Sequence, residues 1–278
     1  MAAATGYDDA PTDEQLLAYA DLPKFGKEMA EVFAVRVPAA AGGNRPPPCG
    51  WISVHGDHCV SGCIYTRSRT DDATSPQACD SQGNLLLTGP SYVISAYAPV
   101  IFLVNLHDGN QEASLQEEGK IFCDTCGDFP VYKCNKAIEE TVETAYGPAD
   151  VTYAIVTNGV QGQGSVKLGR WEGEGRTAIL GRIVARSKMF NVGCVLFYNE
   201  HDKNIRAGSE EMVPLARHAL AVPLSLMIEM DLQCDSGDRI VKAALEINPA
   251  TEGQHIERLI GMNGAEIEVT ISWTDFPW

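Results

Sequence analysis

The sequence predicts an all-β, mainly antiparallel and β-sandwich-like fold, with two related β units in one compact body and a short N-terminal helix. Short runs rich in Val, Ile, Tyr, Phe and Thr follow one another from residue 51 onward, each ended by Gly, Pro, Asn or Asp. These runs are not separated by long amphipathic helices, which favours antiparallel strands over an alternation of helices and strands. Two sets of runs also resemble each other in the same order, which predicts a duplicated unit.

The N-terminal 30 residues are expected to form a helical or disordered extension. Within "TDEQLLAYADLPKFGKEMAEV", residues 12–32, the side chains of Leu16, Leu17 and Ala20 have the spacing of one helix face. Pro23 interrupts this pattern, so we expect a single short helix.

The predicted strands begin with "VFAVRV", residues 32–37, which a Gly- and Pro-rich loop follows up to residue 50. The other expected strands are residues 51–56, 61–67, 84–89, 99–107, 131–134, 141–147, 150–157, 165–171, 177–186, 191–199, 226–233, 239–247 and 265–273. The Gly-rich "NGVQGQGS", residues 158–165, is interpreted as a hairpin loop, because it lacks the Lys-Ser/Thr pair of a phosphate-binding loop.

An internal repeat relates "GWISVHGDHCVSGCIYTR" to "GRIVARSKMFNVGCVLFYN". The two stretches align without a gap at an offset of 131 residues, so that Gly50 falls on Gly181 and Cys63 on Cys194. Downstream, "APVIFLVNL" has a counterpart in "VPLSLMIEMDL", and "ADVTYAIV" has a shorter one in "IEVTISW". Several pairs in the same order favour duplication over chance similarity.

The predicted domain boundaries follow from this repeat. After the extension over residues 1–30, we expect one β unit over residues 31–160 and a second over residues 161–278. A single intertwined domain over residues 31–275 is the alternative division.

Composition limits the partners and the location that the sequence predicts. The chain has 278 residues and a formal net charge of -16, from 37 acidic and 21 basic residues, which disfavours nucleic-acid binding. The N-terminus lacks the cationic and apolar regions of a signal peptide, and Pro99 interrupts the longest apolar stretch, residues 92–106. We therefore expect no membrane span and a cytoplasmic or nuclear protein.

Three cysteines, Cys123, Cys126 and Cys134, are the candidate zinc ligands. Cys123 and Cys126 have the C-x-x-C spacing of a zinc knuckle, and "HGDHCVSGC", residues 55–63, offers further His and Cys side chains. In the second copy of the repeat, the residues equivalent to two of those candidates are Met189 and Phe190, which are not zinc ligands. A strong zinc motif needs two ligand pairs, and only one is present. The favoured interpretation is therefore turn cysteines and buried free thiols, with no metal and no cofactor.

The ionisable residues form no complete catalytic constellation in the sequence. The six histidines are scattered, and no G-x-S-x-G motif is available to build a triad around them. The neighbouring carboxylates of Glu139 and Glu140, and those of Glu210 and Glu211, are expected to be solvated surface groups in so acidic a chain. The sequence therefore assigns no catalytic residue.

An ordered set of motifs carries a family resemblance. The runs "VFAVRV", "GWISVHG", "GCIYTR", "LLLTGPSYVISAYAPVIFLVNL", "VTYAIV", "GRIVAR", "CVLFYN" and "LAVPLSLMIEMDL" resemble the grass domain of unknown function 6598 family over about residues 30–273. Members of that family occur in, or are associated with, the jasmonate-induced ribosome-inactivating proteins of cereals. The resemblance implies a β-rich domain in a plant stress or defence setting.

The resemblance transfers no activity to particular residues. Ribosome-inactivating N-glycosidases carry a Glu-Ala-Ala-Arg helix, and this sequence has none. The closest stretch, "SEEMVPLAR", separates Glu211 from Arg217 by Pro214, which would break the helix that must present both.

The leading hypothesis is a non-catalytic protein-interaction module with an unknown protein partner. Two alternatives stay open. One is rRNA N-glycosidase activity, inferred from the family association alone. The other is a small-molecule or sugar-binding β-sandwich, in which residues 67–84 would form the ligand loop.

Overall fold

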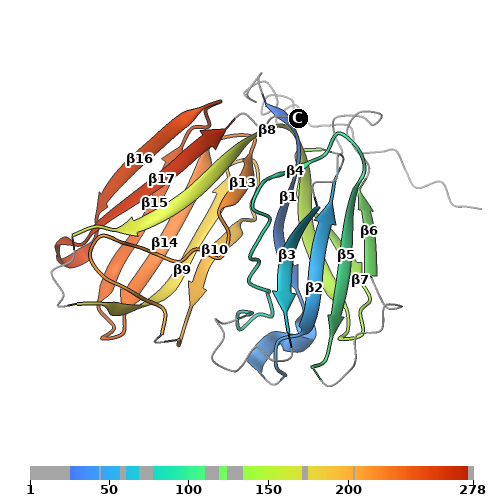
Figure 1. Ribbon diagram of the computed structural model, residues 1–278, viewed down its shortest axis with the longest axis horizontal. Coiled ribbons are helices and arrows are strands. Elements are labelled where there is room, and N and C mark those ends of the chain that lie inside the picture. Colours follow the sequence, from blue (N-terminus) through green and yellow to red (C-terminus); the bar gives the residue numbers. More distant parts are fainter. Residues whose placement is uncertain are drawn as a thin grey trace, which may run out of the picture.

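A computed structural model describes residues 26–43, 45–56, 61–68, 78–109, 119–123, 134–170, 175–202 and 204–274. Figure 1 shows two β-rich lobes side by side, joined at the top of the view by strand β8 (Ala149–Leu168). The regular structure in the described ranges consists of antiparallel strands and short 3-10 helices, among them η1 (Pro38–Gly43) and η4 (Met262–Gly264). The prediction of an antiparallel all-β fold is confirmed. Within these ranges, the structure contains no helix with the length and apolar character needed to cross a bilayer.

The N-terminal unit extends from β1 to the first half of β8 and contains two sheets. One sheet has the order β3-β2-β5-β6, and in the other the first half of β8 pairs with β1 and β7, while β1 also pairs with β4. Its strands are β1 (Lys27–Arg36), β2 (Cys49–His55), β3 (Ser61–Arg67), β4 (Ile94–Ser95), β5 (Val100–His107), β6 (Gly119–Cys123) and β7 (Ile138–Val142).

The C-terminal unit extends from the second half of β8 to β17 and repeats this plan. One sheet has the order β10-β9-β14-β15, and in the other the second half of β8 pairs with β13 and β17, while β17 also pairs with β16. Its strands are β9 (Thr177–Ser187), β10 (Cys194–Asn199), β11 (Arg206–Ala207), β12 (Glu211–Met212), β13 (Ala219–Val222), β14 (Leu226–Cys234), β15 (Arg239–Ile247), β16 (Gly253–Ile260) and β17 (Glu266–Thr274).

Two glycines that the repeat aligns have the same local geometry. Gly50 and Gly181 have φ angles of +119° and +114°, and a Cβ atom at either would lie 2.0 Å from the carbonyl oxygen of Asn105 or Asp231. Each glycine thus lets its strand approach the neighbouring strand at a position where no side chain fits. This shared geometry and the matching strand orders support the repeat that the sequence predicts.

Strand β8 belongs to both units. Its residues 150–159 pair with β1, whereas residues 160–168 pair with β12, β13 and β17. The predicted boundary after residue 160 falls where the partners of β8 change. The division into domains itself stays a prediction.

The two hydrophobic cores meet at β1. Ala30, Val32 and Val35 belong to the core of the N-terminal unit, whereas Met29 and Phe33 pack into the core of the C-terminal unit. β1 is therefore buried on both faces, as the near-continuous apolar run of a central strand requires.

The expected short N-terminal helix lies outside the described residues, so it stays a prediction. Residues 12–25 lie outside the described ranges, and from Lys27 onward the chain forms β1. Met29 and Ala30 stand opposite Val156 and Ile155 in the ladder with β8. The last residues of the expected N-terminal extension, 27–30, therefore belong to β1.

The predicted hairpin loop over residues 158–165 is wrong, because these residues lie in the middle of strand β8. A Cβ atom at Gly162 would lie 2.9 Å from the ring of Trp273, and one at Gly159 would lie 2.9 Å from Sδ of Met29. The glycines allow large side chains to lie directly against the strand, which is a use of glycine inside sheets.

Candidate functional site

A cleft between the two units is the first candidate site. It has a volume of ≈ 290 Å³, and both units line it. Phe33, Thr152 and several side chains between residues 80 and 87 line it from the N-terminal unit, whereas residues 192–195 and Arg217 line it from the C-terminal unit. Interfaces between folded units are a frequent place for ligand sites.

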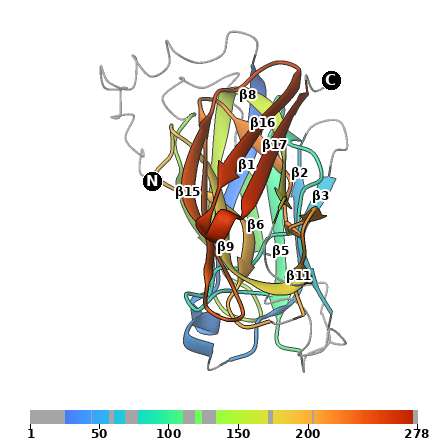
Figure 2. The same cartoon turned by 90° about the vertical axis from the view of Figure 1, so that its left-hand side faces the viewer.

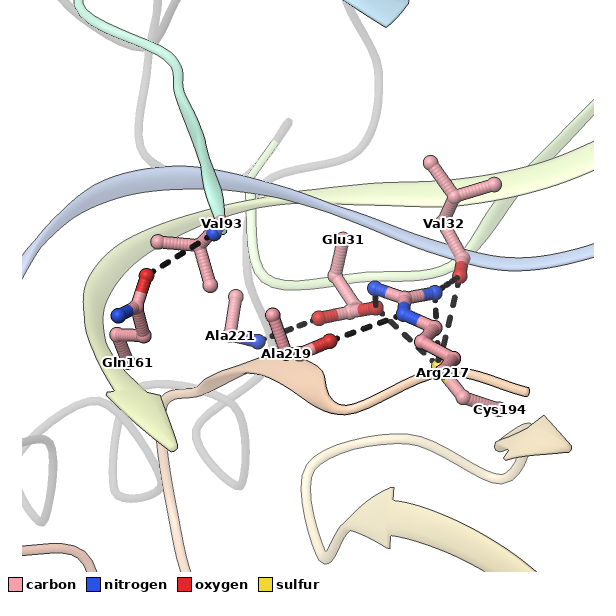
Figure 3. A network of polar contacts seen from close by, with 8 residues as sticks. All are labelled: Glu31, Val32, Val93, Gln161, Cys194, Arg217, Ala219 and Ala221. Carbon is pink, nitrogen blue, oxygen red and sulfur yellow. Dashed lines mark hydrogen bonds and ion pairs between the residues drawn. The ribbon is translucent and has the colours of Figure 1, made fainter. Parts of the chain in front are cut away.

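A buried ion pair joins the units beneath this cleft (Figure 3). Arg217 pairs with Glu31, and each side chain is 3% exposed. Arg217 also donates hydrogen bonds to the carbonyl oxygens of Val32 and of Ala219, the latter at 2.9 Å, and the second oxygen of Glu31 accepts the N–H of Ala221. Buried charges are tolerated when they are paired and hydrogen-bonded in this way.

The thiol of Cys194 completes this network. It is 3% exposed, and its Sγ atom donates to Oε1 of Glu31 across 3.2 Å. Burial, together with the nearby charge of Glu31, raises the pKa of the thiol well above its ordinary value. Only the thiolate is a strong nucleophile, so Cys194 is not suited to nucleophilic chemistry.

The guanidinium of Arg217 remains charged. Burial opposes the cation most strongly, but the attraction of Glu31 and Cys194, together with the hydrogen bond to Glu31, outweighs it and raises the pKa of Arg217. A second buried contact between the units lies nearby, where Oε1 of Gln161 accepts the N–H of Val93 at 3.1 Å (Figure 3). These polar groups bind each other across the interface, which leaves none of them free for acid–base chemistry.

Within the part of the chain that the structure describes, the mouth of the cleft offers one cation without an ion-pair partner. The exposed side chain of Arg182 lines the cleft and has no ion-pair partner among the described residues. Asp80, by contrast, is occupied, because its Oδ1 accepts the backbone N–H groups of Gln82 and Asn84 at 2.9 Å. A small anion is therefore the kind of ligand that this mouth could hold.

A shallow hollow on the outer face of β9, β14 and β15 also includes Arg182. Its volume is ≈ 550 Å³. The other charged side chains there are already paired, since Glu229 binds Arg186 and Asp231 lies 3.5 Å from Lys242. Exposed pairs of this kind contribute little to stability and are screened by salt.

A cluster of exposed apolar side chains lies on and beside β16, and we call it the β16 patch. It consists of Ile256, Ile260 and Met262, whose side chains are 51%, 83% and 53% exposed. Figure 2 shows β15, β16 and β17 on the side of the molecule that faces the viewer. Ile256 and Ile260 point to the same face because they lie four positions apart along the strand, and side chains alternate with a period of two. Gathered apolar residues on a surface mark an interaction site more often than scattered ones do.

Comparison with known families decides where the chain belongs. A family model described as a domain of unknown function (DUF6598) matches residues 29–271. The chain belongs to the DUF6598 family. No curated protein matches this DUF6598 chain.

Several solved structures resemble the DUF6598 chain at a low level. Three of them are human GIVD cytosolic phospholipase A2, two of these in complex with methyl gamma-linolenyl fluorophosphonate. Their sequence identities are 9% to 11%, and their TM-scores are 0.24 to 0.26. The alignments cover 88% to 90% of this chain, which spans 30% to 32% of the length of those chains.

The structure does not bring the candidate zinc cysteines together as three thiols. Cys123 is a buried cysteine at the end of β6, whereas Cys134 is disulfide-bonded. Cys126 lies outside the described residues. A sulfur in a disulfide cannot serve as a thiolate ligand, and the described residues contain no group of three His, Cys, Asp or Glu that could hold a metal ion.

Glu211 and Arg217, the pair nearest to a glycosidase motif, have separate partners in the DUF6598 chain. The carboxylate of Glu211 lies 2.8 Å from the guanidinium of Arg176 and accepts the N–H of Gly208. Arg217 is held by Glu31. Arg217 lines the inter-unit cleft, and Glu211 does not.

The sequence interpretation missed two features of this DUF6598 chain. Glu31 is a single acid inside the apolar run of β1, and an acid in such a position signals a buried partner. The β16 patch lies in "GQHIERLI", where the apolar residues Ile256, Leu259 and Ile260 do not alternate with polar residues as they do in a half-buried strand.

Proposed function

We propose that this chain is a non-catalytic protein-interaction module, and that the β16 patch is its docking surface. The observation that carries the proposal is the exposure of Ile256 and Ile260 on a strand that has no fully buried residue. A strand whose apolar side chains remain in solvent gains from being covered, because each apolar area removed from water contributes favourably to binding.

The interior of the inter-unit cleft supports the same proposal. Its reactive groups, Cys194, Arg217 and Glu31, are bonded to one another or to the backbone. An enzyme active site needs titratable groups that are available to a substrate. The family resemblance adds a plant stress or defence setting and an association with jasmonate-induced ribosome-inactivating proteins to the proposal. The cytoplasmic or nuclear location expected from the N-terminal sequence is also part of it.

Capture of a partner tests this proposal. The wild-type chain and a variant with Ile256→Ser and Ile260→Ser would be immobilised and exposed to extract from the tissue that expresses the chain. The proposal predicts a protein that the wild type retains in a stoichiometric complex and the variant loses. Phe122→Ser is the matched control, since Phe122 is 66% exposed on the edge strand β6. Retention by the β16 variant, or equal loss by the control, would refute the proposed surface.

A second candidate function is the binding of a small anion in the inter-unit cleft. The free guanidinium of Arg182 at the mouth of the cleft is the observation that favours it. A thermal-shift panel of nucleotides and sugar phosphates tests it, with Arg182→Gln as the variant that should abolish any shift.

The geometry gives no support to rRNA N-glycosidase activity. Glu211 is paired with Arg176 and Arg217 with Glu31, so the two residues do not face a common substrate. An adenine-release assay on ribosomes tests this directly. Turnover that disappears on Glu211→Gln would overturn the non-catalytic proposal.

A further inference from the structure

The free edge of β16 differs from the other edges of the described sheets. β16 has eight residues and pairs with β17 through eight consecutive positions without a bulge. Among the described edge strands, β3, β10 and β15 have a bulge in the ladder that joins them to their neighbour, and β6 and β7 have only five residues each. Bulges and short lengths prevent another strand from adding to an edge, and β16 has neither protection.

The backbone groups on the outward edge of β16 have no partner among the described residues. β16 is the last strand in its sheet order, and the described part of the chain places no strand on its other side. In an antiparallel ladder, alternate residues direct both N–H and C=O away from their partner. An added strand would satisfy these groups, which is the basis of peptide recognition by strand addition.

The side chains of β16 would select what is added. Ile256 and Ile260 lie on one face of the strand, with Arg258 between them. Residues that stand opposite each other in adjacent strands contact one another, and an apolar residue opposite isoleucine is favourable. The ladder therefore fits a segment whose apolar residues also alternate.

The charge of the residues around β16 determines which kind of alternating segment would bind to its edge. Residues 251–274 contain four glutamates and one arginine. That arginine, Arg258, is already paired with Glu268 at 2.9 Å, whereas Glu252 and Glu266 have no ion-pair partner in the described ranges. The formal charge of the whole chain, -16, has the same sign. Basic residues would be attracted to this edge, and a second copy of the chain would be repelled.

We infer that β16 binds an extended segment of a partner protein, in which apolar residues alternate with Lys or Arg, by adding that segment as a further strand of the sheet. This inference rests on the proposed function and specifies the partner of the same surface. The backbone edge supplies affinity, and the isoleucines and glutamates supply selectivity.

Hydrogen–deuterium exchange with defined peptides tests this inference. The probes are a capped octapeptide of alternating Lys and Val, and the same peptide with Glu in place of Lys. The Lys peptide should slow exchange over residues 253–260 and should bind more weakly as salt is raised, and the Glu peptide should not bind. The variant with Ile256→Ser and Ile260→Ser should lose roughly tenfold in affinity, and Phe122→Ser should bind as the wild type does.

Two kinds of result would overturn the inference, and they can be distinguished from each other. Absence of binding by the Lys peptide, or equal binding by the Glu peptide, would exclude a basic strand. Such a peptide result would leave the proposed docking function intact if capture of the partner protein still depended on Ile256 and Ile260. A concentration-dependent dimer that the serine variant loses in sedimentation would assign the edge to a second copy. Unchanged thermal unfolding of both variants confirms that neither result reflects misfolding.

Discussion

Replacing Glu31 by glutamine removes the charge that neutralises Arg217 at the interface between the two units. In the wild type, one carboxylate oxygen of Glu31 accepts from Arg217 and Cys194, and the other accepts the N–H of Ala221. Glutamine has one acceptor oxygen and one NH2 group. Its NH2 group, which is itself a donor, would therefore face either the donors of Arg217 and Cys194 or the N–H of Ala221.

The magnitude follows from the burial of this pair. Both side chains are 3% exposed, so Arg217 would remain in the interior as an uncompensated cation. Breaking a buried pair by removing one partner costs about 3–5 kcal/mol. The matched control is Glu268→Gln, which breaks an ion pair with Arg258, a side chain that is 76% exposed. For such an exposed pair we expect about 0–1 kcal/mol.

Urea unfolding of the two variants measures this difference as a change in the free energy of unfolding. Glu31→Gln should lower that free energy by several kcal/mol more than Glu268→Gln. The double replacement Glu31→Leu with Arg217→Met removes both charges and should recover most of the loss, because a buried pair is often replaceable by apolar residues. Equal effects of the Glu31 and Glu268 variants would refute the buried, inter-unit role of Glu31.

Three further predictions concern backbone geometry and thiol chemistry. Gly50→Ala and Gly181→Ala should each destabilise by more than about 2 kcal/mol in urea unfolding, whereas Gly237→Ala, with φ +87° and open space around it, should cost only about 1 kcal/mol. A maleimide reagent at neutral pH should label the exposed Cys63 first and reach Cys194 only on unfolding, as peptide mass spectrometry would show; early labelling of Cys194 would contradict its burial. Because folding raises the pKa of Cys194 above its ordinary 9.0, the thiol's contribution to stability is fully present below pH 9.0 and declines as the pH rises further. The stability difference between wild type and Cys194→Ala should therefore fall by up to about 1.4 kcal/mol per pH unit above that value, and a constant difference would argue against the raised pKa.

Local patterns predicted the sheets well where one face of a strand is apolar. The alternation in residues 177–186 and 239–247 corresponds to β9 and β15, and the sequence repeat aligns Gly50 with Gly181, which share the same backbone geometry. In these stretches the hydrophobic period and the ending residues carry enough information by themselves.

The prediction of local structure failed where pairing with strands far away in the sequence decides the conformation. The Gly-rich middle of β8 resembles a loop, but it is held as a strand by β13 and β17, which come later in the chain. Such effects are absent from any local window of sequence.

Within the candidate site, the sequence predicted which catalytic motif is missing, but it did not predict which residues contact each other. The absence of a glycosidase helix was visible in Pro214, but nothing near Arg217 in the sequence points to Glu31. Those two residues are brought together only by the docking of the two units. The β16 strand was missed because Ile256 and Ile260 face solvent while Leu259 packs against the core, so the apolar residues of the strand do not follow the period of two that marks a half-buried strand.

The most direct test of the proposed function is hydrogen–deuterium exchange of the full chain with and without the captured partner. Slower exchange over residues 253–260, with no change over residues 119–123 of the comparable edge strand β6, is the result that docking at β16 predicts. Protection confined to residues 80–87 and 192–195 around the inter-unit cleft, with β16 exchanging as in the free chain, would contradict it.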